Sequence, residues 1–409
     1  MQSDEIGNQQ NARCPFPLAR SAGPLSPPPE YESMRMEAGP RRVTMWNGET
    51  AWAFTRWQDV RELLSSPHFS AVPSTPGYPT LSPARASALE AYQSFITMDP
   101  PDHGFYRRMI TKEFTFKRMQ ELRPRVQSVL DDLLDRIEAG GQPADLVTAL
   151  AGPLPSIVIS LMLGVPAEYH RDMEAFGAQK NDITADPSVP AEAARQMGII
   201  IDRILREREA NPGSGEDLLS RLVIDQILPG HLSHQAAVSM VSLLYLAGHE
   251  TTTNQITLGI VTLLRNPDQL EKMKAQPDTV ARAVDEMLRF NSIVQYNSAR
   301  VATADVEIGG HLVQKGEGVY ALITAANHDP EVYPHPDCFD VERDASNHMA
   351  FSFGIHQCLG QSLARMELEI VFGTLFQRLP DLRLAIPFEQ LEFKNEQLVH
   401  GLRSLPVLW

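Results

Sequence analysis

The sequence predicts a mainly α-helical protein with small β-sheets, and three observations support that fold class. Apolar residues recur at three- and four-residue spacing over long stretches, such as residues 116–140 and 362–379. A further apolar stretch runs without proline from Ser233 to Pro267. Alternating, strand-like runs are short, and the β-rich parts lie near residues 42–55, 292–325 and 383–409.

The N-terminal region predicts few regular elements. Residues 1–12 are expected to form a flexible tail, and the proline-rich residues 13–40 an extended arm with no helix or strand. Two alternating runs then flank Asn47-Gly48, a strong signal for a hairpin with a two-residue loop. A helical pattern begins at Trp57, and a loop rich in proline, serine and glycine occupies residues 67–83.

The stretch that begins near Ser233 predicts one helix that crosses the whole molecule. At about 1.5 Å per residue it would be roughly 50 Å long, and its apolar character on nearly all sides indicates burial. Its middle nevertheless holds the polar segment from Gly248 to Asn254. Polar groups in a buried helix need partners or a function.

Composition excludes several classes of function. The formal net charge of −15 disfavours a nucleic-acid partner. Residues 1–12 carry neither a signal peptide nor a membrane anchor, and the apolar run at residues 238–247 is too short to span a bilayer, so we expect a cytoplasmic protein with no membrane partner. The three cysteines are far apart and form no CxxC pair, which argues against a disulfide framework or a cysteine-rich zinc site: Cys14, Cys338 and Cys358.

The polar segment AGHETTT, residues 247–253, allows two interpretations. The second ligand of an HExxH zinc site is missing, because Thr253 stands four residues after His249. The threonine hydroxyls can bond back to the preceding turn of a kinked helix. Alternatively, Glu250 and Thr251 can pass protons to a molecule that is bound against the helix.

Two further pairs have both a structural and a functional interpretation. Glu286 and Arg289, three residues apart on a helix face, can form an ordinary surface ion pair. His103 and Arg107, four residues apart after Pro100-Pro101, can form a solvated basic face or can hold a carboxylate or phosphate.

The segment FSFGIHQCLGQ, residues 351–361, places Cys358 between Gly354 and Gly360, just ahead of a helical pattern. A thiolate that binds a metal needs a site that stabilises negative charge, and the N-terminal end of a helix with nearby loop amides offers one. The glycines would let the backbone approach a flat cofactor closely. The alternative is a single buried structural cysteine.

These features, in this order and with the spacing Phe351, Gly354, His356, Cys358, Gly360, resemble the cytochrome P-450 superfamily, in particular its soluble actinobacterial members. The resemblance covers nearly the whole chain. It implies a haem-thiolate monooxygenase fold with a long central oxygen-activating helix and haem buried between helices. All 409 residues would then form one domain, although length alone suggests two or three.

Carried over by position, the resemblance implies that Cys358 is the axial ligand to the iron of haem b. Phe351 would pack near the sulfur, and Gly354 and Gly360 would let the loop turn beneath the haem. Ser352 stands where many members have glycine, which we treat as a minor departure. Four residues match positions that bind the haem propionates: His103, Arg107, Arg300 and His356.

The same resemblance assigns the other two motifs. Glu250 and Thr251 match the acid and alcohol that supply protons to the bound oxygen. Glu286 and Arg289 match a structural pair that joins an arginine further along the chain, which is expected to be Arg343.

The expected reaction is hydroxylation or epoxidation of a bulky apolar small molecule such as a natural-product intermediate. Atypical oxidations, namely C–C coupling, nitration or a reaction like that of nitric oxide reductases, remain alternatives, as does a haem-based gas sensor without turnover. Candidate residues of the substrate pocket are Phe95, Ile96, Met240, Leu243, Leu244, Ala247, Ile293, Val294, Leu398 and Val399.

The chain shows no flavin or nicotinamide module, so electrons from NAD(P)H would arrive through an external ferredoxin and ferredoxin reductase. Residues 103–118 form a basic patch, with Lys112 and Arg118 among its cations, that is suited to an acidic ferredoxin. We expect the protein to be a monomer.

Overall fold

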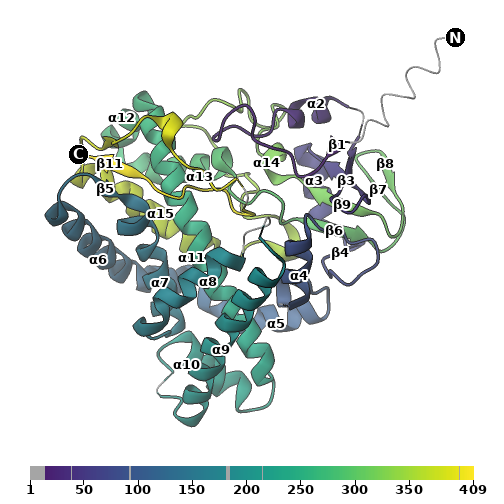
Figure 1. Ribbon diagram of the computed structural model, residues 1–409, viewed down its shortest axis with the longest axis horizontal. Helices are drawn as coiled ribbons and strands as arrows, with labels where there is room; N and C mark the ends of the chain where they lie inside the picture. Colours follow the sequence, from purple (N-terminus) through teal and green to yellow (C-terminus); the bar gives the residue numbers. More distant parts are fainter. Residues whose placement is uncertain (1–13, 38, 92–93, 181–184, 214, 396) are drawn as a thin grey trace.

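The computed structural model describes residues 14–37, 39–91, 94–180, 185–213, 215–395 and 397–409. The expected flexible tail, residues 1–12, lies outside this part of the chain. The helices surround the long helix α11, and the largest sheet lies at one side of the molecule (Figure 1). The helices are α2 (Glu30–Met36), α3 (Trp57–Ser65), α4 (Pro83–Ala91), α5 (Asp102–Thr111), α6 (Phe116–Gly140), α7 (Pro153–Leu163), α8 (His170–Lys180), α9 (Ser188–Ala210), α10 (Leu218–Leu222), α11 (His234–Arg265), α12 (Pro267–Ala275), α13 (Val280–Asn291), α14 (Ile323–Ala326) and α15 (Gln361–Arg378).

Within the described residues, the strands form three small sheets. The largest has the order β1-β2-β3-β9-β6-β4, in which β1–β2 and β3–β9 are parallel pairs and the other pairs are antiparallel. A second sheet has the order β10-β11-β5, and β7 pairs with β8. The strands are β1 (Cys14–Pro15), β2 (Arg41–Thr44), β3 (Thr50–Phe54), β4 (Phe69–Ser70), β5 (Ala144–Asp145), β6 (Ala299–Ala302), β7 (Val306–Ile308), β8 (His311–Val313), β9 (Gly318–Ala321), β10 (Arg383–Leu384) and β11 (Pro406–Leu408).

The N-terminal arm and the hairpin differ from the predictions in detail. The arm contains α2, which begins directly after Pro29 and buries Tyr31 and Met34, so burial stabilises a helix too short to form alone. In the hairpin, the N–H of Met45 donates to the carbonyl of Glu49, which leaves three residues in the loop instead of two. Gly48 supplies the left-handed conformation that such a loop requires, with φ 84°.

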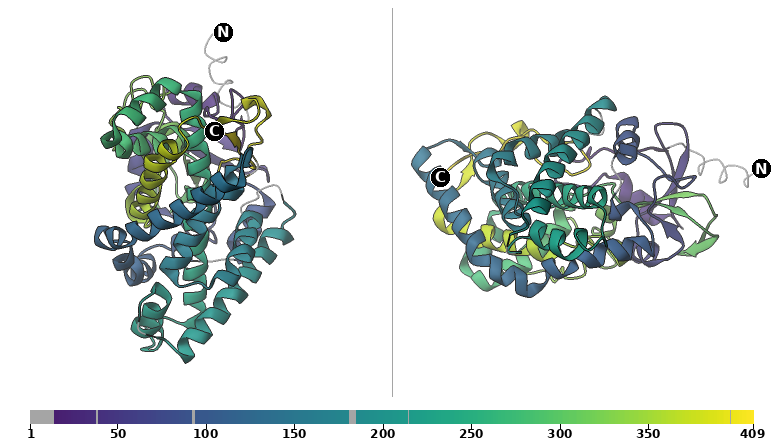
Figure 2. Two further views of the ribbon diagram at one scale, coloured as in Figure 1. Left: turned by 90° about the vertical axis from the view of Figure 1, so that its left-hand side faces the viewer. Right: turned by 90° about the horizontal axis from the view of Figure 1, so that it is seen from below.

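Helix α11 begins at the predicted place and passes through the molecule (Figures 1 and 2). Ser233 caps it, because its hydroxyl accepts a hydrogen bond from the N–H of Ala236 at 3.2 Å. Helices α7, α9, α13 and α15 pack against it. At Gly259 an added Cβ would lie 2.4 Å from the ring of Phe372, so this glycine allows α15 to approach closely.

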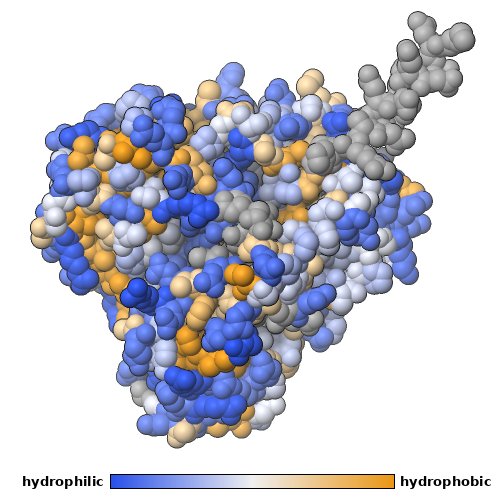
Figure 3. Space-filling model, in the orientation of Figure 1, coloured by the Kyte–Doolittle hydropathy of each residue, from blue (hydrophilic) through white to orange (hydrophobic). Residues whose placement is uncertain are grey.

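The outer surface of this fold is mostly polar. Figure 3 shows hydrophilic residues over most of one face, with separate, smaller apolar areas between them. Within the described residues, no helix combines the length and apolar character that crossing a bilayer requires.

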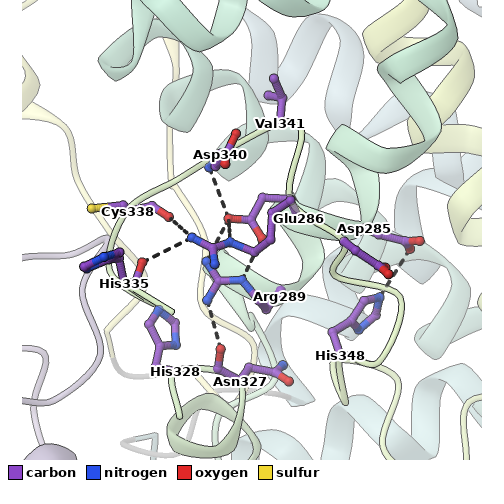
Figure 4. Close-up of polar contacts among 12 residues, drawn as sticks. Asp285, Glu286, Arg289, Asn327, His328, His335, Cys338, Asp340, Val341 and His348 are labelled. Carbon is purple, nitrogen blue, oxygen red and sulfur yellow. Dashed lines mark hydrogen bonds and ion pairs between the residues drawn. The ribbon is translucent and has the colours of Figure 1, made fainter. Parts of the chain in front are cut away.

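Glu286 and Arg289 of α13 form a fully buried ion pair, not a surface one (Figure 4). Arg289 donates two hydrogen bonds to the carboxylate of Glu286, at 2.6 and 2.8 Å, and a third to the carbonyl of Asn327 at 2.9 Å. Arg343 donates to Glu286 at 3.1 Å and also to the carbonyls of Pro334, His335 and Cys338. The three side chains therefore join α13 to the irregular segment that precedes the loop of Cys358.

We expect Arg289→Met to destabilise the fold by about 3–5 kcal/mol, because it leaves the carboxylate of Glu286 buried with a weaker set of partners. The change is measured as the midpoint of urea unfolding, followed by circular dichroism. Lys272→Met is the matched control, since Lys272 pairs with Glu342 at 2.8 Å on the surface, and we expect it to leave the midpoint unchanged. Equal midpoints for the two variants would contradict a structural role for the buried pair.

Candidate active site

The loop before α15 is fixed in place by its backbone. The N–H of Cys358 donates to the carbonyl of Phe351 at 2.8 Å. Gly354 has a left-handed φ of 73°, and an added Cβ would lie 2.2 Å from the carbonyl oxygen of Leu64, at the end of α3. Only glycine fits there, so the loop packs directly on α3.

Ser352 occupies the same left-handed region, with φ 61°. For a residue with a Cβ this conformation costs about 1–2 kcal/mol, which glycine would avoid. The departure noted in the sequence therefore falls at a position where glycine has a conformational advantage.

The sulfur of Cys358 has a mixed electrostatic environment. Its side chain is exposed, and the surface that it exposes lines a cavity. Desolvation by the surrounding protein raises the pKa of the thiol, while the N–H of Gly360 and the guanidinium groups of Arg107 and Arg365 oppose that shift. A metal cation bound to the sulfur would favour the thiolate over the thiol further.

Imidazole and guanidinium groups gather near the same cavity. The rings of His103 on α5 and His356 in the loop lie 4.2 Å apart between centroids. Burial lowers the pKa of both, that of His356 to about 3 with the help of nearby Arg300, so both rings are neutral at pH 7. His103 Nε2 and His356 Nδ1 are buried and have no hydrogen-bond partner among the described residues. Arg107 donates to the carbonyl of Gln357 at 2.6 Å.

Helix α11 forms the other side of the cavity. Thr251 lines it, and its hydroxyl donates to the carbonyl of Ala247 at 2.6 Å, so the bond back to the preceding turn does form. Glu250 is buried, 4 % exposed, and does not line the cavity. At Gly248 an added Cβ would lie 2.8 Å from Ile159 of α7, which explains a glycine at the centre of this helix.

The cavity has a volume of about 280 Å³. Most of the residues proposed for substrate contact line it, namely Phe95, Ile96, Leu243, Leu244, Ala247, Ile293 and Val294.

Three others lie outside the cavity wall. Met240 packs in the main hydrophobic core, one helical turn before the cavity. Leu398 packs in a separate core beside the largest sheet. Val399 lies next to the lining residue Val294, with which it forms an isolated β-bridge.

Among the residues expected at the cofactor, six line the cavity: Phe351, Gly360, Arg300, Arg107, His356 and Cys358. His103 and Gly354 do not line it; His103 contacts the ring of His356, and Gly354 packs against Leu64 of α3. Sequence reasoning missed several polar residues of the wall, which no motif marks. They include Tyr78, Arg85, Thr97, Gln255, Asn297, Ser298 and Glu367.

Haem fits this set of residues. Cys358 is the one cysteine among the described residues that line the cavity, which suits one axial thiolate ligand. The two neutral, unpartnered imidazole nitrogens and the guanidinium groups of Arg107 and Arg300 suit carboxylates at the edge of a flat ring. The predicted site residues thus come together from α5, β6, α11 and the loop before α15.

Comparison with known proteins agrees with this geometry. The family model described as Cytochrome P450 matches residues 190–402. Cytochrome P450-SU2 of Streptomyces griseolus is 42% identical over 394 residues, which cover 96% of both chains. Vitamin D3 dihydroxylase of the same organism is 40% identical over 410 residues and covers 100% of both. The crystal structure of mycinamicin VIII C21 methyl hydroxylase MycCI from Micromonospora griseorubida, bound to mycinamicin VIII, has a TM-score of 0.92 and 35% identity, and the match covers 97% of this chain and 100% of that one. With its cysteine loop, its central helix and relatives matched from end to end, the chain belongs to the cytochrome P450 family.

Proposed function

We propose that the cavity binds haem b with Cys358 as the axial ligand to iron, and that the protein is a monooxygenase for a bulky apolar natural product. The observation that carries this proposal is the thiol of Cys358 on the wall of the cavity that Gly248 and Thr251 of α11 also line. When bound, haem supplies the activation of O2 and the insertion of one oxygen atom into the substrate.

His103, Arg107, Arg300 and His356 hold the two propionates in this proposal. Arg107 and Arg300 each already donate to a backbone carbonyl, of Gln357 and Ala299 respectively, which fixes their guanidinium groups beside the cavity. The remaining N–H groups of both arginines are available for carboxylates. His356 and His103 support each other through ring contact.

Thr251 and Glu250 have different roles in the proposed delivery of protons to the cavity. Thr251 lines the cavity, and because its hydroxyl hydrogen points back to the carbonyl of Ala247, its oxygen is oriented to accept a hydrogen bond from a water in the cavity. Glu250, the preceding residue, is buried, and in this proposal it exchanges protons with the cavity by way of Thr251. Thr251 is therefore the residue that contacts the contents of the cavity, and Glu250 supplies protons to the cavity indirectly, by way of Thr251.

The proposed substrate class follows from the wall of the cavity and from the relatives. Aliphatic and aromatic side chains from η1 (Phe95–Thr97), α11 and residues 293–294 form much of the wall. One relative is named for hydroxylation of vitamin D3, and another is a methyl hydroxylase bound to mycinamicin VIII. Hydroxylation is favoured over C–C coupling, nitration, nitric oxide reduction or gas sensing for two reasons. Relatives that are named as hydroxylases are similar to this chain over nearly its whole length. The chain also has Glu250 and Thr251, which the proposed delivery of protons requires.

The redox partner proposed here is a ferredoxin that docks over α5, the short helix η2 (Lys112–Phe114) and the start of α6, with electrons from NAD(P)H through a reductase. Glu113, the one acid between residues 103 and 118, is paired with Arg221 at 2.6 Å, so it does not offset the basic patch. Lys112 pairs with Asp225 at 2.6 Å, and Arg118 with Glu121 at 3.3 Å, at the surface. Three exposed apolar residues of these elements and of the adjacent cysteine loop suit an interface core: Phe105, Phe116 and Ile355.

The central experiment replaces Cys358 by serine. We expect the reduced carbon monoxide complex of the native protein to show the long-wavelength Soret band of a thiolate-bound haem, and C358S to lose it. The exposed Cys338 is the matched control, and C338S keeps the band. Survival of the band in C358S would refute the assignment of the ligand.

Replacement of Thr251 by alanine tests proton delivery. We expect NADH consumption to continue while product formed per NADH falls by at least about tenfold, since a positioned proton donor contributes on the order of 10²–10⁴. The control is Thr253→Ala, because the hydroxyl of Thr253 makes the same type of bond, to the carbonyl of His249 at 3.0 Å, but lies away from the cavity. Unchanged coupling in T251A would count against the assignment.

Charge reversal tests the docking surface. In the double variant K112E/R118E we expect reduction by an acidic ferredoxin to slow by about tenfold at low ionic strength, with the dissociation constant of the substrate unchanged. Reversal of Lys272 and Lys274 on α12, which lies far from α5 in Figure 1, provides the control and should leave the rate unchanged. A rate for K112E/R118E equal to that of the control would rule out this surface.

A further inference from the structure

One cation in the cavity has no role in the proposed haem site. Arg85 lies on α4, lines the cavity and donates a hydrogen bond of 2.7 Å to the side-chain oxygen of Asn297. The hydroxyl of Ser82 accepts the backbone N–H of Arg85 at 3.1 Å, which fixes the start of this helix. The guanidinium group therefore has a defined position on a wall that is otherwise largely apolar.

Arg85 has no carboxylate partner among the described residues, since its one side-chain hydrogen bond goes to a neutral amide. Burial lowers the pKa of Arg85, and the ionisable groups that act on it are the phenols of Tyr78 and Tyr320. Asp99, by contrast, acts on Arg300 and His103. Arg85 is partly exposed, on the cavity wall, and because its ionisable neighbours are neutral, a ligand that supplies negative charge there would stabilise its guanidinium group.

The cavity itself does not supply that charge. Glu367 of α15 is the acidic residue among those that line it, and burial raises the pKa of Glu367 well above its ordinary value, which favours its neutral form. Tyr78, which also lines the cavity, has its pKa raised by burial and remains a neutral phenol. Both groups can donate hydrogen bonds, and neither neutralises Arg85.

We infer that Arg85, together with Asn297 and Tyr78, receives a carboxylate of the substrate. The substrate is then an apolar skeleton that carries one acidic group, which Arg85 holds at a fixed distance from the site of oxidation. This inference rests on the proposed function and narrows its substrate class. A planar guanidinium binds a carboxylate through two parallel hydrogen bonds, so the contact orients the substrate as well as attracting it.

A haem propionate is the other possible source of a carboxylate at Arg85. Tyr78, Arg85 and Arg300 all line the cavity, and Tyr78 acts on the pKa of both arginines, so the two arginines lie in the same region of it. Arg107, Arg300, His103 and His356 already provide four groups for the two propionates, and we therefore assign Arg85 to the substrate. The experiment below separates the two sources.

The test measures binding to the haem-loaded protein at pH 7.5. Two acids, abietic acid and dodecanoic acid, are compared with their methyl esters, and dissociation constants are measured by calorimetry and by the shift of the Soret band. We expect each acid to bind about 10- to 100-fold more tightly than its ester, because a hydrogen bond to a charged group contributes a gain in affinity of that size. In R85Q this preference disappears while the affinity for the esters is retained, and R85K keeps part of it. The matched control R282Q, at an exposed arginine, behaves as the native protein does.

Three results would overturn the inference. One is that neither acid binds the native protein more tightly than its ester. Another is that R85Q weakens acids and esters equally. The third is a loss of haem content in R85Q with the preference for acids intact, which would assign Arg85 to a propionate. The carbon monoxide spectrum of each variant tests the proposed function separately, because a thiolate-type band without a preference for acids leaves that function standing and removes only the carboxylate contact.

Discussion

The buried ion pair of Glu286 and Arg289 is the interaction on which the site depends. Both side chains are fully buried, and together with Arg343 they connect α13 to four backbone carbonyls of residues 327–338. The chain continues from this segment into the loop of Cys358. A buried pair of this kind adds little stability over an apolar core of equal volume, so its value lies in fixing a segment that has almost no regular structure.

Apolar and polar side chains of the site occupy two different regions of the cavity. The wall beside α11 and η1 is mainly apolar, whereas the region near α5 and β6 holds imidazole and guanidinium groups. A flat cofactor with one polar edge matches both regions at once. Arg85 is a further cation of the cavity wall that the haem site does not require, and its proposed role changes the expectation from a purely apolar substrate to one with an acidic group.

The family, the mainly helical fold and the long central helix followed from local motifs, because the residues of the cysteine loop and of AGHETTT are close together in the sequence. The pocket was harder to predict. Helical spacing places Met240 on the same face as Leu243 and Leu244 but does not show where along α11 the cavity ends. Arg85 was missed because its role depends on neighbours more than two hundred residues away, such as Asn297. The short helix α2 escaped prediction because tertiary burial of two side chains stabilises it.

The buried ring nitrogens of His103 and His356 make the stability of the fold dependent on cofactor supply. Without a partner, each imposes a desolvation penalty of about 1–3 kcal/mol on the native state. A ligand that binds only the native state and satisfies these groups shifts the folding equilibrium by mass action. In a cell that produces the polypeptide faster than haem, the excess chains would be the less stable form and the first substrates of proteolysis.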